Sequence, residues 1–338
     1  MPPAWSDQLQ AHVGVPPSGT DFGLTAAGAS GNMVFGQYIS SSGMGVGLID
    51  LTTGEVSRLS SFGPNAGGLN WINVELPWVV WDQQDSNSQP GWTLVAFNVN
   101  THERLVLSAD PAAPGQQVRG GVPPYPVIKN GRVAWSEAMA PSGDGKPQSR
   151  IVLYDLGARS SHTIVGGATV SAPVFAGGDL IWGLQRADKS FSFQAVLADT
   201  LQPVHLGLQP SGIGSIQYVA GSDDYLAWSS ADLETLSVFH LTTGVESRFA
   251  AVPDLLHRVQ FPALTGDYAV WYTGDRFSVM DLTNGAAFDV QGSATVGEGV
   301  IAFAQPVGAV LKGQISSSRI GEVKISQVPH LTRTACTP

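Results

Sequence analysis

The sequence predicts an all-β protein built from one repeated unit of four short strands. Large apolar anchor residues recur at steps of 43 to 54 residues, with a last step of 32. A turn of the type Asp-Leu-x-x-Gly follows several of them, and helical periodicity is nearly absent. The seven anchors are Phe35, Trp81, Trp135, Trp182, Trp228, Trp271 and Phe303.

The clearest copy of the unit is the segment 266–285. It opens with Gly266-Asp267, continues as a short apolar strand that ends on Trp271, and resumes as a second strand over 277–282. That strand stops at Asn284-Gly285, a strong hairpin signal, because type I′ turns require positive φ at both central residues. The same unit is readable in the segment 222–244.

The complete unit has four strands, as its third copy shows most plainly. There we expect strands over 124–128, 132–137, 151–156 and 162–165. Four-stranded repeats of 40 to 50 residues are typical of propeller blades. A blade buries both faces only when neighbours stack on it, which explains the almost continuous apolar runs 78–81 and 133–135.

We therefore expect one domain over 1–338, a single β-propeller of four-stranded antiparallel blades. Seven blades are expected, with six as the fallback, and the copy after Phe303 is the weakest. Residues 1–22 fit no complete unit and are expected to close the ring, with 8–13 supplying a strand to the last blade. Residues 327–338 are expected to form a tail, and 254–257 are the one candidate for a helical turn.

Composition limits the functional classes. The 338 residues are 43% hydrophobic and only 13% charged, which provides a large core, and the net charge of −10 argues against nucleic acid as a partner. No apolar run is long enough to span a membrane. The first residues lack the basic and apolar regions of a signal peptide, as a mature chain also would. The single cysteine, Cys336, excludes an internal disulfide.

An apolar strand ending in Trp, an Asp-Leu-x-x-Gly turn and a short outer strand resemble the repeat of the TolB-like, or WD-type, propellers. The match covers about 31–290 and specifies architecture better than activity. The usual Ser-Pro-Asp-Gly turn of that group is reduced here to Asn130-Gly131, Gly177-Gly178-Asp179 and Gly266-Asp267. The group contains interaction modules, sensor domains and oligosaccharide lyases, so the resemblance implies binding at one face of the ring in an extracytoplasmic setting.

Two columns of residues mark the starts of the innermost strands. Ten residues before successive anchors lie Trp71, Tyr125, Ala172, Tyr218 and Phe261. Eleven residues before them lie Asn70, Pro124, Ser171, Gln217 and Gln260. Neighbours on a strand point to opposite faces. We therefore expect the aromatic column to pack between blades and the polar column to lie nearer the channel, where amides satisfy channel waters or bind sugar hydroxyls.

The loops at the same mouth carry charge. Asp82 and Glu137 are the candidate catalytic pair, although strand alternation predicts that they point oppositely, which favours solvated loop charges. A lone histidine such as His257 is more often structural than functional. The candidate ligand-binding residues are Asn70, Arg119, Ser171, Arg186, Gln217, His257, Arg258 and Gln260.

No metal site or cofactor is predicted. The histidines lie on separate units, and the adjacent pair Asp223-Asp224 lacks the ligand series of a calcium loop, so a structural Ca²⁺ has no further support. The glycine run 43–47 lies between strands and opens no helix, which excludes a phosphate loop. No Gly-x-Ser-x-Gly elbow precedes a helix.

Two functions remain open. We favour a non-catalytic module that binds a protein or an oligosaccharide at one mouth of the channel, because the scaffold repeat is strong and no convergent catalytic set accompanies it. The alternative is a carbohydrate-active enzyme, a glycoside hydrolase or polysaccharide lyase, at the same mouth. It would use Asp82 or Glu137 together with Arg186 and His257.

Overall fold

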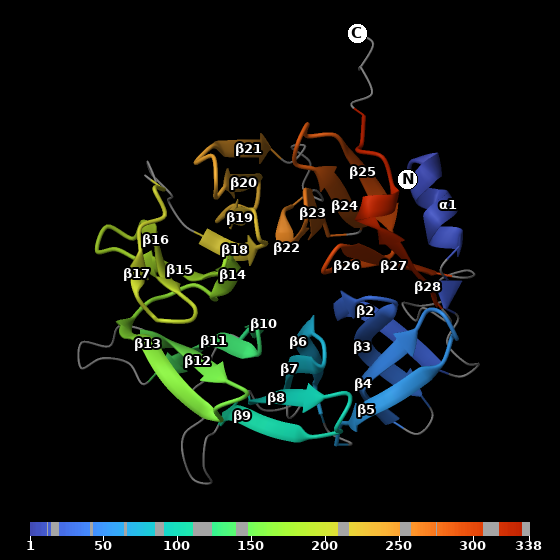
Figure 1. Ribbon diagram of the computed structural model, residues 1–338, viewed down its shortest axis with the longest axis horizontal. Helices are drawn as coiled ribbons and strands as arrows, with labels where there is room; N and C mark the ends of the chain where they lie inside the picture. Colours follow the sequence, from blue (N-terminus) through green and yellow to red (C-terminus); the bar gives the residue numbers. More distant parts are fainter. Residues whose placement is uncertain are drawn as a thin grey trace.

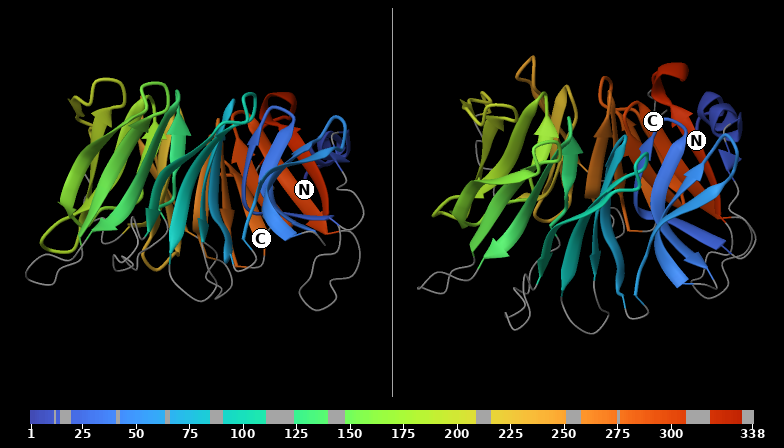
Figure 2. Two further views of the ribbon diagram at one scale, coloured as in Figure 1. Left: turned by 90° about the horizontal axis from the view of Figure 1, so that it is seen from below. Right: turned by 60° about the horizontal axis from the view of Figure 1, so that its bottom comes forward.

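The protein is known as a computed structural model, whose sheets stand around a common centre in a propeller ring (Figure 1). The structure describes residues 1–11, 13–14, 20–40, 43–63, 66–84, 91–110, 124–139, 148–208, 216–250, 258–274, 276–306 and 318–332. Seen from the edge, the strands run between two faces of a thick disc (Figure 2). No helix in these ranges is long and apolar enough to cross a membrane.

Five sheets have four antiparallel strands each, and in every one the strand order follows the chain. Sheet by sheet they are β6 (Gly68–Glu75), β7 (Trp78–Gln84), β8 (Trp92–Asn98) and β9 (Arg104–Asp110); β10 (Val127–Lys129), β11 (Arg132–Met139), β12 (Gln148–Asp155) and β13 (Ser160–Ala168); β14 (Val174–Ala176), β15 (Asp179–Gln185), β16 (Phe191–Leu197) and β17 (Pro203–Val204); β18 (Ile216–Gly221), β19 (Tyr225–Ser230), β20 (Thr235–His240) and β21 (Glu246–Ala250); β22 (Gln260–Thr265), β23 (Tyr268–Tyr272), β24 (Arg276–Asp281) and β25 (Ala287–Gln291).

The remaining strands form one eight-stranded sheet that joins the two ends of the chain. Its order is β1 (Val13–Gly14), β28 (Ser318–Lys324), β27 (Val300–Pro306), β26 (Ser293–Gly297), β2 (Thr20–Ser30), β3 (Met33–Ser40), β4 (Gly43–Asp50) and β5 (Val56–Ser61). The expectation of seven separate blades is therefore wrong at this place. Ala29 of β2 pairs in parallel with Gly297 of β26, which merges the first and last units into one sheet.

The merger depends on a missing side chain. A Cβ atom on Gly297 would collide with the carbonyl oxygen of Ala29, so only glycine lets the two backbones approach this closely. Sequence periodicity cannot reveal such a junction, because it reports the spacing of units and not the pairing between them.

The N-terminal segment contributes a strand later than expected. Val13 pairs with Gly321 and Gly14 with Ile320, so β1 does lie against β28. However, the expected strand over 8–13 is wrong for 8–11, which belong to the helix α1 (Pro3–Ala11). Pro3 suits the first helical position, and Trp5 and Leu9 lie one turn apart on the buried face.

Helix α1 lies beside β28 and places Trp5 against the sheet β22–β25. The Trp5 ring makes edge contacts with Tyr268 and Phe288, each with centroids 5.2 Å apart. Leu331 joins the same apolar cluster from the other end of the chain, just after the short 3-10 helix η1 (Ile325–Gln327). Both ends of the described chain therefore stabilise one sheet.

The predicted anchors are confirmed as buried residues of the second strand of each unit. From Trp81 to Phe303 each packs in a cluster with the preceding sheet; Trp135, for example, shares a cluster with Val80 and Leu94. Phe35 is the exception, because it packs forward against Trp81 and Val79. This face-to-face packing keeps both surfaces of each sheet dry.

The repeated turn has one hydrogen-bond pattern. Oδ1 of Asp50 accepts hydrogen bonds from the backbone N–H groups of Thr52 and Thr53, and Asp281 accepts one from Thr283 in the same way. His240 replaces the aspartate in the fifth unit, and its Nδ1 accepts from the N–H groups of Thr242 and Thr243.

Candidate functional site

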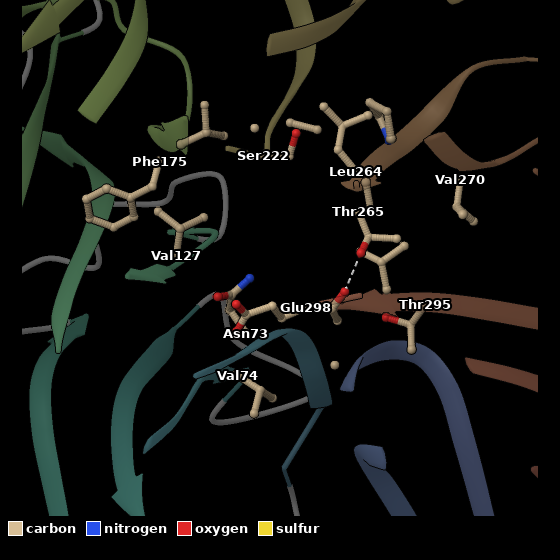
Figure 3. Close-up of a pocket in the computed structure, with 18 of the residues that line it drawn as sticks. Asn73, Val74, Val127, Phe175, Ser222, Leu264, Thr265, Val270, Thr295 and Glu298 are labelled. Atoms are coloured by element: carbon tan, nitrogen blue, oxygen red, sulfur yellow. Dashed lines mark hydrogen bonds between the residues drawn. The ribbon is translucent and has the colours of Figure 1, made fainter. Parts of the chain in front are cut away.

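A cavity of about 1000 Å³ occupies the centre of the ring. The innermost strands β2, β6, β10, β14, β18, β22 and β26 line it, so every sheet of the ring contributes (Figure 3). Its wall alternates apolar residues such as Val74, Val127 and Leu264 with polar ones such as Asn73 and Thr295. The cavity follows the channel at whose mouth a ligand was expected, which makes its two ends the candidate sites.

The two ends differ in chemistry. We call the end where the innermost strands begin the entry face; it carries Trp71 and Phe261. We call the opposite end the turn face; it carries the tight turns at Asn130-Gly131 and Gly177-Gly178, whose φ angles are positive. Strands β7, β11 and β15 end on the entry face. The predicted site residues Asp82, Glu137 and Arg186, which lie near or just after those strand ends, therefore lie on this face.

Four aromatic rings meet at the entry face. Trp71 lies 5.6 Å from Tyr125 and 6.2 Å from Phe261, and Phe261 lies 4.5 Å from Tyr218, measured between ring centroids. Trp71 and Phe261 belong to non-adjacent sheets, so their contact crosses the central axis. Phe261 is 36% exposed and the other three rings are half-buried. We call these four residues the aromatic cluster.

The aromatic cluster overturns the expected roles of the two columns. The aromatic residues were expected in the interfaces between neighbouring blades, yet they converge across the channel. The physical reason is a bulge in three innermost strands, where one extra residue interrupts the pairing: between Leu69 and Trp71, between Ile216 and Val219, and between Gln260 and Ala263. A bulge redirects side chains that simple alternation would send to the other face.

Two members of the cluster have unusual backbone geometry. Tyr125 has a φ of 45° and Phe261 a φ of 49°, in the left-handed region that bulky residues rarely adopt. A proline follows each of them, Pro126 and Pro262, and restricts the backbone further. Backbone strain of this kind is concentrated at binding and active sites.

Asp82 is buried directly beside the aromatic cluster. Its side chain has no solvent exposure, Oδ2 accepts a hydrogen bond of 3.0 Å from Asn70 Nδ2, and Oδ1 has no hydrogen-bond partner. Burial raises the pKa of Asp82 to about 7, although the Asn70 hydrogen bond acts in the opposite direction. Burial, with the Tyr218 hydroxyl and the Asp82 carboxylate nearby, raises the pKa of Tyr125 to about 12.

Glu137 has a structural environment. It is buried, its Oε1 accepts a hydrogen bond of 3.3 Å from Trp135 Nε1, and it lies 3.2 Å from a guanidinium nitrogen of Arg150. Asp82 lies on the same side of β7 as Val80, and Val80 and Trp135 share one cluster. Because neighbouring sheets face each other, the two carboxylates enter the same interface from opposite sides.

The other predicted residues fall into four groups. Asn70 is the one that the structure joins to a predicted catalytic residue, through its bond to Asp82. The Ser171 hydroxyl donates to the Ala172 carbonyl and accepts from the Gly183 N–H, and Gln260 begins β22. Arg186 and Arg258 are exposed beside the second and first strands of their sheets. Arg119, His257 and the side chain of Gln217 lie outside the described residues.

The aromatic cluster is the feature that site prediction missed. All four residues stand in the column read from the sequence, but they were assigned to packing. The dipeptides Tyr125-Pro126 and Phe261-Pro262 were the available signal, since a bulky residue before proline at a strand start indicates an irregular backbone.

The turn face is polar and mostly acidic. Lys129 Nζ lies 3.0 Å from Asp223 Oδ1, an ion pair that skips one sheet of the ring. The Glu75 carboxylate accepts hydrogen bonds of 2.7 and 2.9 Å from the N–H groups of Asn130 and Gly131. Within the ranges that the structure describes, no group of three or more His, Cys, Asp or Glu side chains is arranged to hold a metal ion.

Comparison with known proteins shows the fold of this chain and does not show its function. No family model matches the sequence, and no curated protein matches it. An oligogalacturonate lyase in complex with manganese is similar in structure, with 11% sequence identity, a TM-score of 0.58, and coverage of 93% of this chain and 92% of that chain. The chain has the β-propeller fold.

Two further structures were found. Oligogalacturonate lyase from Vibrio parahaemolyticus has 10% identity, a TM-score of 0.56 and coverage of 91% of each chain. TolB from Acinetobacter baumannii has 12% identity, a TM-score of 0.46, and coverage of 71% of this chain and 57% of that chain. At such identities a likeness reports the fold alone. The architecture-level resemblance to propellers that the repeat predicted is confirmed by the two lyase structures.

Proposed function

We propose that the protein is a non-catalytic binding module that holds a protein or oligosaccharide ligand on its entry face. The observation that carries this proposal is the aromatic cluster, in which rings from four different sheets meet at the axis with part of their surface exposed. Exposed aromatic faces beside a few polar groups are typical of ligand sites in concave apolar pockets.

The strained backbone of Tyr125 and Phe261 also supports a ligand-binding role for the aromatic cluster. Packing alone does not require Tyr125 and Phe261 to adopt positive φ, since most interior aromatic residues here lie in regular strands. A bulge at the start of a strand can turn an aromatic ring toward the axis. A ring in that position suits a surface that binds a ligand. A ligand at the axis would touch several sheets at once, as propeller ligands commonly do.

The test is a binding screen followed by calorimetry. The tryptophan fluorescence of the protein is expected to change when it is titrated with a panel of neutral and acidic oligosaccharides and of short peptides, and calorimetry then measures the affinity of each variant. Trp71→Phe should weaken binding at least fivefold, whereas Trp78→Phe, at the other end of its sheet, should leave it unchanged. Equal binding by both variants would move the site away from the entry face.

A second candidate function, a glycoside hydrolase or polysaccharide lyase, rests on Asp82. A carboxyl group whose pKa is raised to about 7 is protonated in part at neutral pH and suits a general acid. The entry of Glu137 into the same interface adds a second carboxylate, although Arg150 and Trp135 already occupy it. Incubation with polysaccharides that include oligogalacturonates decides this: turnover that Asp82→Asn abolishes would establish an enzyme.

We also interpret the eight-stranded sheet as two four-stranded halves, β2–β5 and β26–β28 with β1, which would make seven sectors around the axis.

We further propose an extracytoplasmic location, as the resemblance to TolB-like propellers implied. Fractionation of the native cells with an antibody against the protein tests the location, and recovery with cytoplasmic markers would overturn it.

A further inference from the structure

We propose that the ligand of the entry face carries a quaternary or N-methylated ammonium group, which the aromatic cluster and Asp82 recognise together. This inference rests on the proposed binding function and narrows it to one chemical class. It is argued from the ring geometry, from the unpartnered oxygen of Asp82 and from where the protein uses its own cations.

The rings provide the surface that an alkylated cation prefers. Tyr125, Trp71, Phe261 and Tyr218 form a continuous chain of ring contacts, with centroid distances from 4.5 to 6.2 Å. Their interplanar angles of 83°, 41° and 46° mean that the rings are inclined to one another and form a curved wall instead of a flat stack. A cation within about 6 Å of several ring faces gains attraction from each ring quadrupole.

Above about pH 7, where Asp82 is ionised, a negative charge lies beside this wall. Asp82 Oδ1 is buried and has no hydrogen-bond partner, so the carboxylate has unused hydrogen-bonding capacity. The backbone of Asp82 pairs with that of Trp71, so the carboxylate lies close to the aromatic cluster and contributes to the raised pKa of Tyr125. A buried carboxylate needs a compensating charge, and a ligand cation is one source of it.

No internal cation fills the site in the part of the chain that the structure describes. The two cation–π contacts found there are Arg58 over Tyr38 and Arg159 over Trp78, and neither ring belongs to the aromatic cluster. The net charge of −10 favours the approach of a positive ligand. Among the described residues, therefore, no arginine or lysine makes a cation–π contact with the aromatic cluster.

An alkylated ammonium fits this site better than a primary one. A primary ammonium carries three N–H donors that must find acceptors when they lose water. The charged acceptor beside the rings is a single carboxylate whose Oδ2 already accepts from Asn70. Methyl groups on the nitrogen remove those donors, spread the charge and add apolar surface for the rings.

The decisive experiment compares a cation with its neutral isostere. Choline and 3,3-dimethyl-1-butanol have the same shape, because a quaternary carbon replaces the quaternary nitrogen, and differ in charge. In NMR titrations of the full chain at pH 8 we expect choline to bind at least tenfold more tightly than the alcohol. Tetramethylammonium chloride and ammonium chloride, in parallel, test whether methylation matters.

Variants then assign the effect to the rings. Phe261→Leu keeps an apolar side chain at an exposed position but removes the π face, and should weaken choline binding at least fivefold. Phe261→Tyr keeps the ring and should retain it. Phe249→Leu, on the outer strand β21, is the matched control for loss of an aromatic residue and should have no effect.

The outcomes separate this inference from the proposed function. If the alcohol binds as tightly as choline, or if Phe261→Leu binds choline normally, the site does not select a cation and the inference fails. If a neutral oligosaccharide binds at Trp71 while choline and tetramethylammonium do not, the inference fails and the proposed function stands. If choline binds with the expected preference and Phe261→Leu loses it, the inference holds.

Discussion

Asn70 donates a hydrogen bond of 3.0 Å to Oδ2 of Asp82, whose other oxygen is buried without a partner. The first residue comes from the extra position of a bulge in β6 and the second from the end of β7. One carboxylate is therefore held in place on one side and left unsatisfied on the other, which has consequences for stability as well as for binding.

The first prediction concerns the pH dependence of stability. The pKa of Asp82 is raised on folding from 3.8 to about 7, so the folded state holds a proton that the unfolded state releases. Stability should therefore fall as the pH rises from about 4 to 7. Asp82→Asn keeps the shape and the Asn70 contact, and should stabilise the protein by up to about 4 kcal/mol at pH 8, at about 1.4 kcal/mol per pKa unit.

Urea unfolding at pH 5 and pH 8 measures this effect. Asp223→Asn, at a side chain that is 71% exposed, is the matched control and should shift stability by less than about 0.5 kcal/mol. A variant Asp82→Asn that loses stability at pH 8, or that keeps the pH dependence of the parent protein, would contradict the assignment.

The second prediction concerns the ion pair of Glu137 with Arg150. Glu137→Gln retains an acceptor for Trp135 but removes the charge that faces a partly exposed guanidinium, and should destabilise the protein by about 1–2 kcal/mol. Adding Arg150→Met should recover part of the loss. The exposed pair of Glu103 with Arg159 is the control, where Glu103→Gln should cost less than about 1 kcal/mol.

Double-mutant cycles in denaturant provide the measurement. Additive effects of the two substitutions would show that Glu137 and Arg150 do not stabilise each other, and would free Glu137 for a catalytic role.

The third prediction concerns the junction of the first and last units. Gly297→Ala places a methyl group against the carbonyl oxygen of Ala29 and should destabilise the protein by about 1–3 kcal/mol, as overpacking does. Gly63→Ala, where the added methyl group meets nothing, is the control. Thermal unfolding compares them, and equal midpoints would show that β2 and β26 tolerate separation.

The fourth prediction concerns the C-terminal segment. Oδ2 of Asp281 accepts a hydrogen bond of 3.0 Å from the Leu331 N–H and lies 2.8 Å from His330 Nδ1. Burial opposes ionisation of Asp281, but the hydrogen bonds from Thr283, His330 and Leu331 outweigh it and lower the pKa. The stability it contributes is present above the unfolded pKa of about 3.8 and is lost as the pH falls below that value.

Asp281→Ala should therefore destabilise the protein by about 1–3 kcal/mol at pH 7 and by much less at pH 3. Hydrogen exchange at the Leu331 amide should accelerate at least tenfold in this variant. His162→Ala, at an exposed position on β13, serves as control. Unchanged protection of Leu331 would show that other contacts hold the segment.

The repeat could be predicted because it is recorded in residue spacing. Trp135 and Trp182 mark second strands in the sequence and are buried in second strands in the structure. A hairpin was also predictable after the strand that ends at Asp281, and β24 does pair with β25. The expected type I′ turn is wrong, because Gly285 has a positive φ of 72° and Asn284 does not. Alternation also placed Asp82 and Glu137 correctly on opposite sides of their own strands. The interpretation of the two as solvated loop charges is wrong, because both side chains are buried within β7 and β11.

The predictions that were wrong concern contacts between units, which sequence spacing does not report. No pattern in the sequence predicts that Gly297 lies against Ala29. None predicts that neighbouring sheets bring Asp82 and Glu137 into one interface. The direction of Trp71 and Phe261 depends on bulges, and a single extra residue reverses the face to which a side chain points. The helix at Trp5 was missed because a nine-residue segment with only two large apolar residues, Trp5 and Leu9, has little periodicity.

The shared cluster of Trp5 and Leu331 has a consequence for biosynthesis. Trp5 and Leu331 are more than three hundred positions apart, so the ribosome synthesises α1 long before Leu331. The helix α1 therefore lacks its final packing partners while the intermediate sheets form. During that interval the open edges of β2 and β26 are exposed to other nascent chains. We expect truncation before residue 318 to yield aggregated material, and chaperone demand to be highest late in translation.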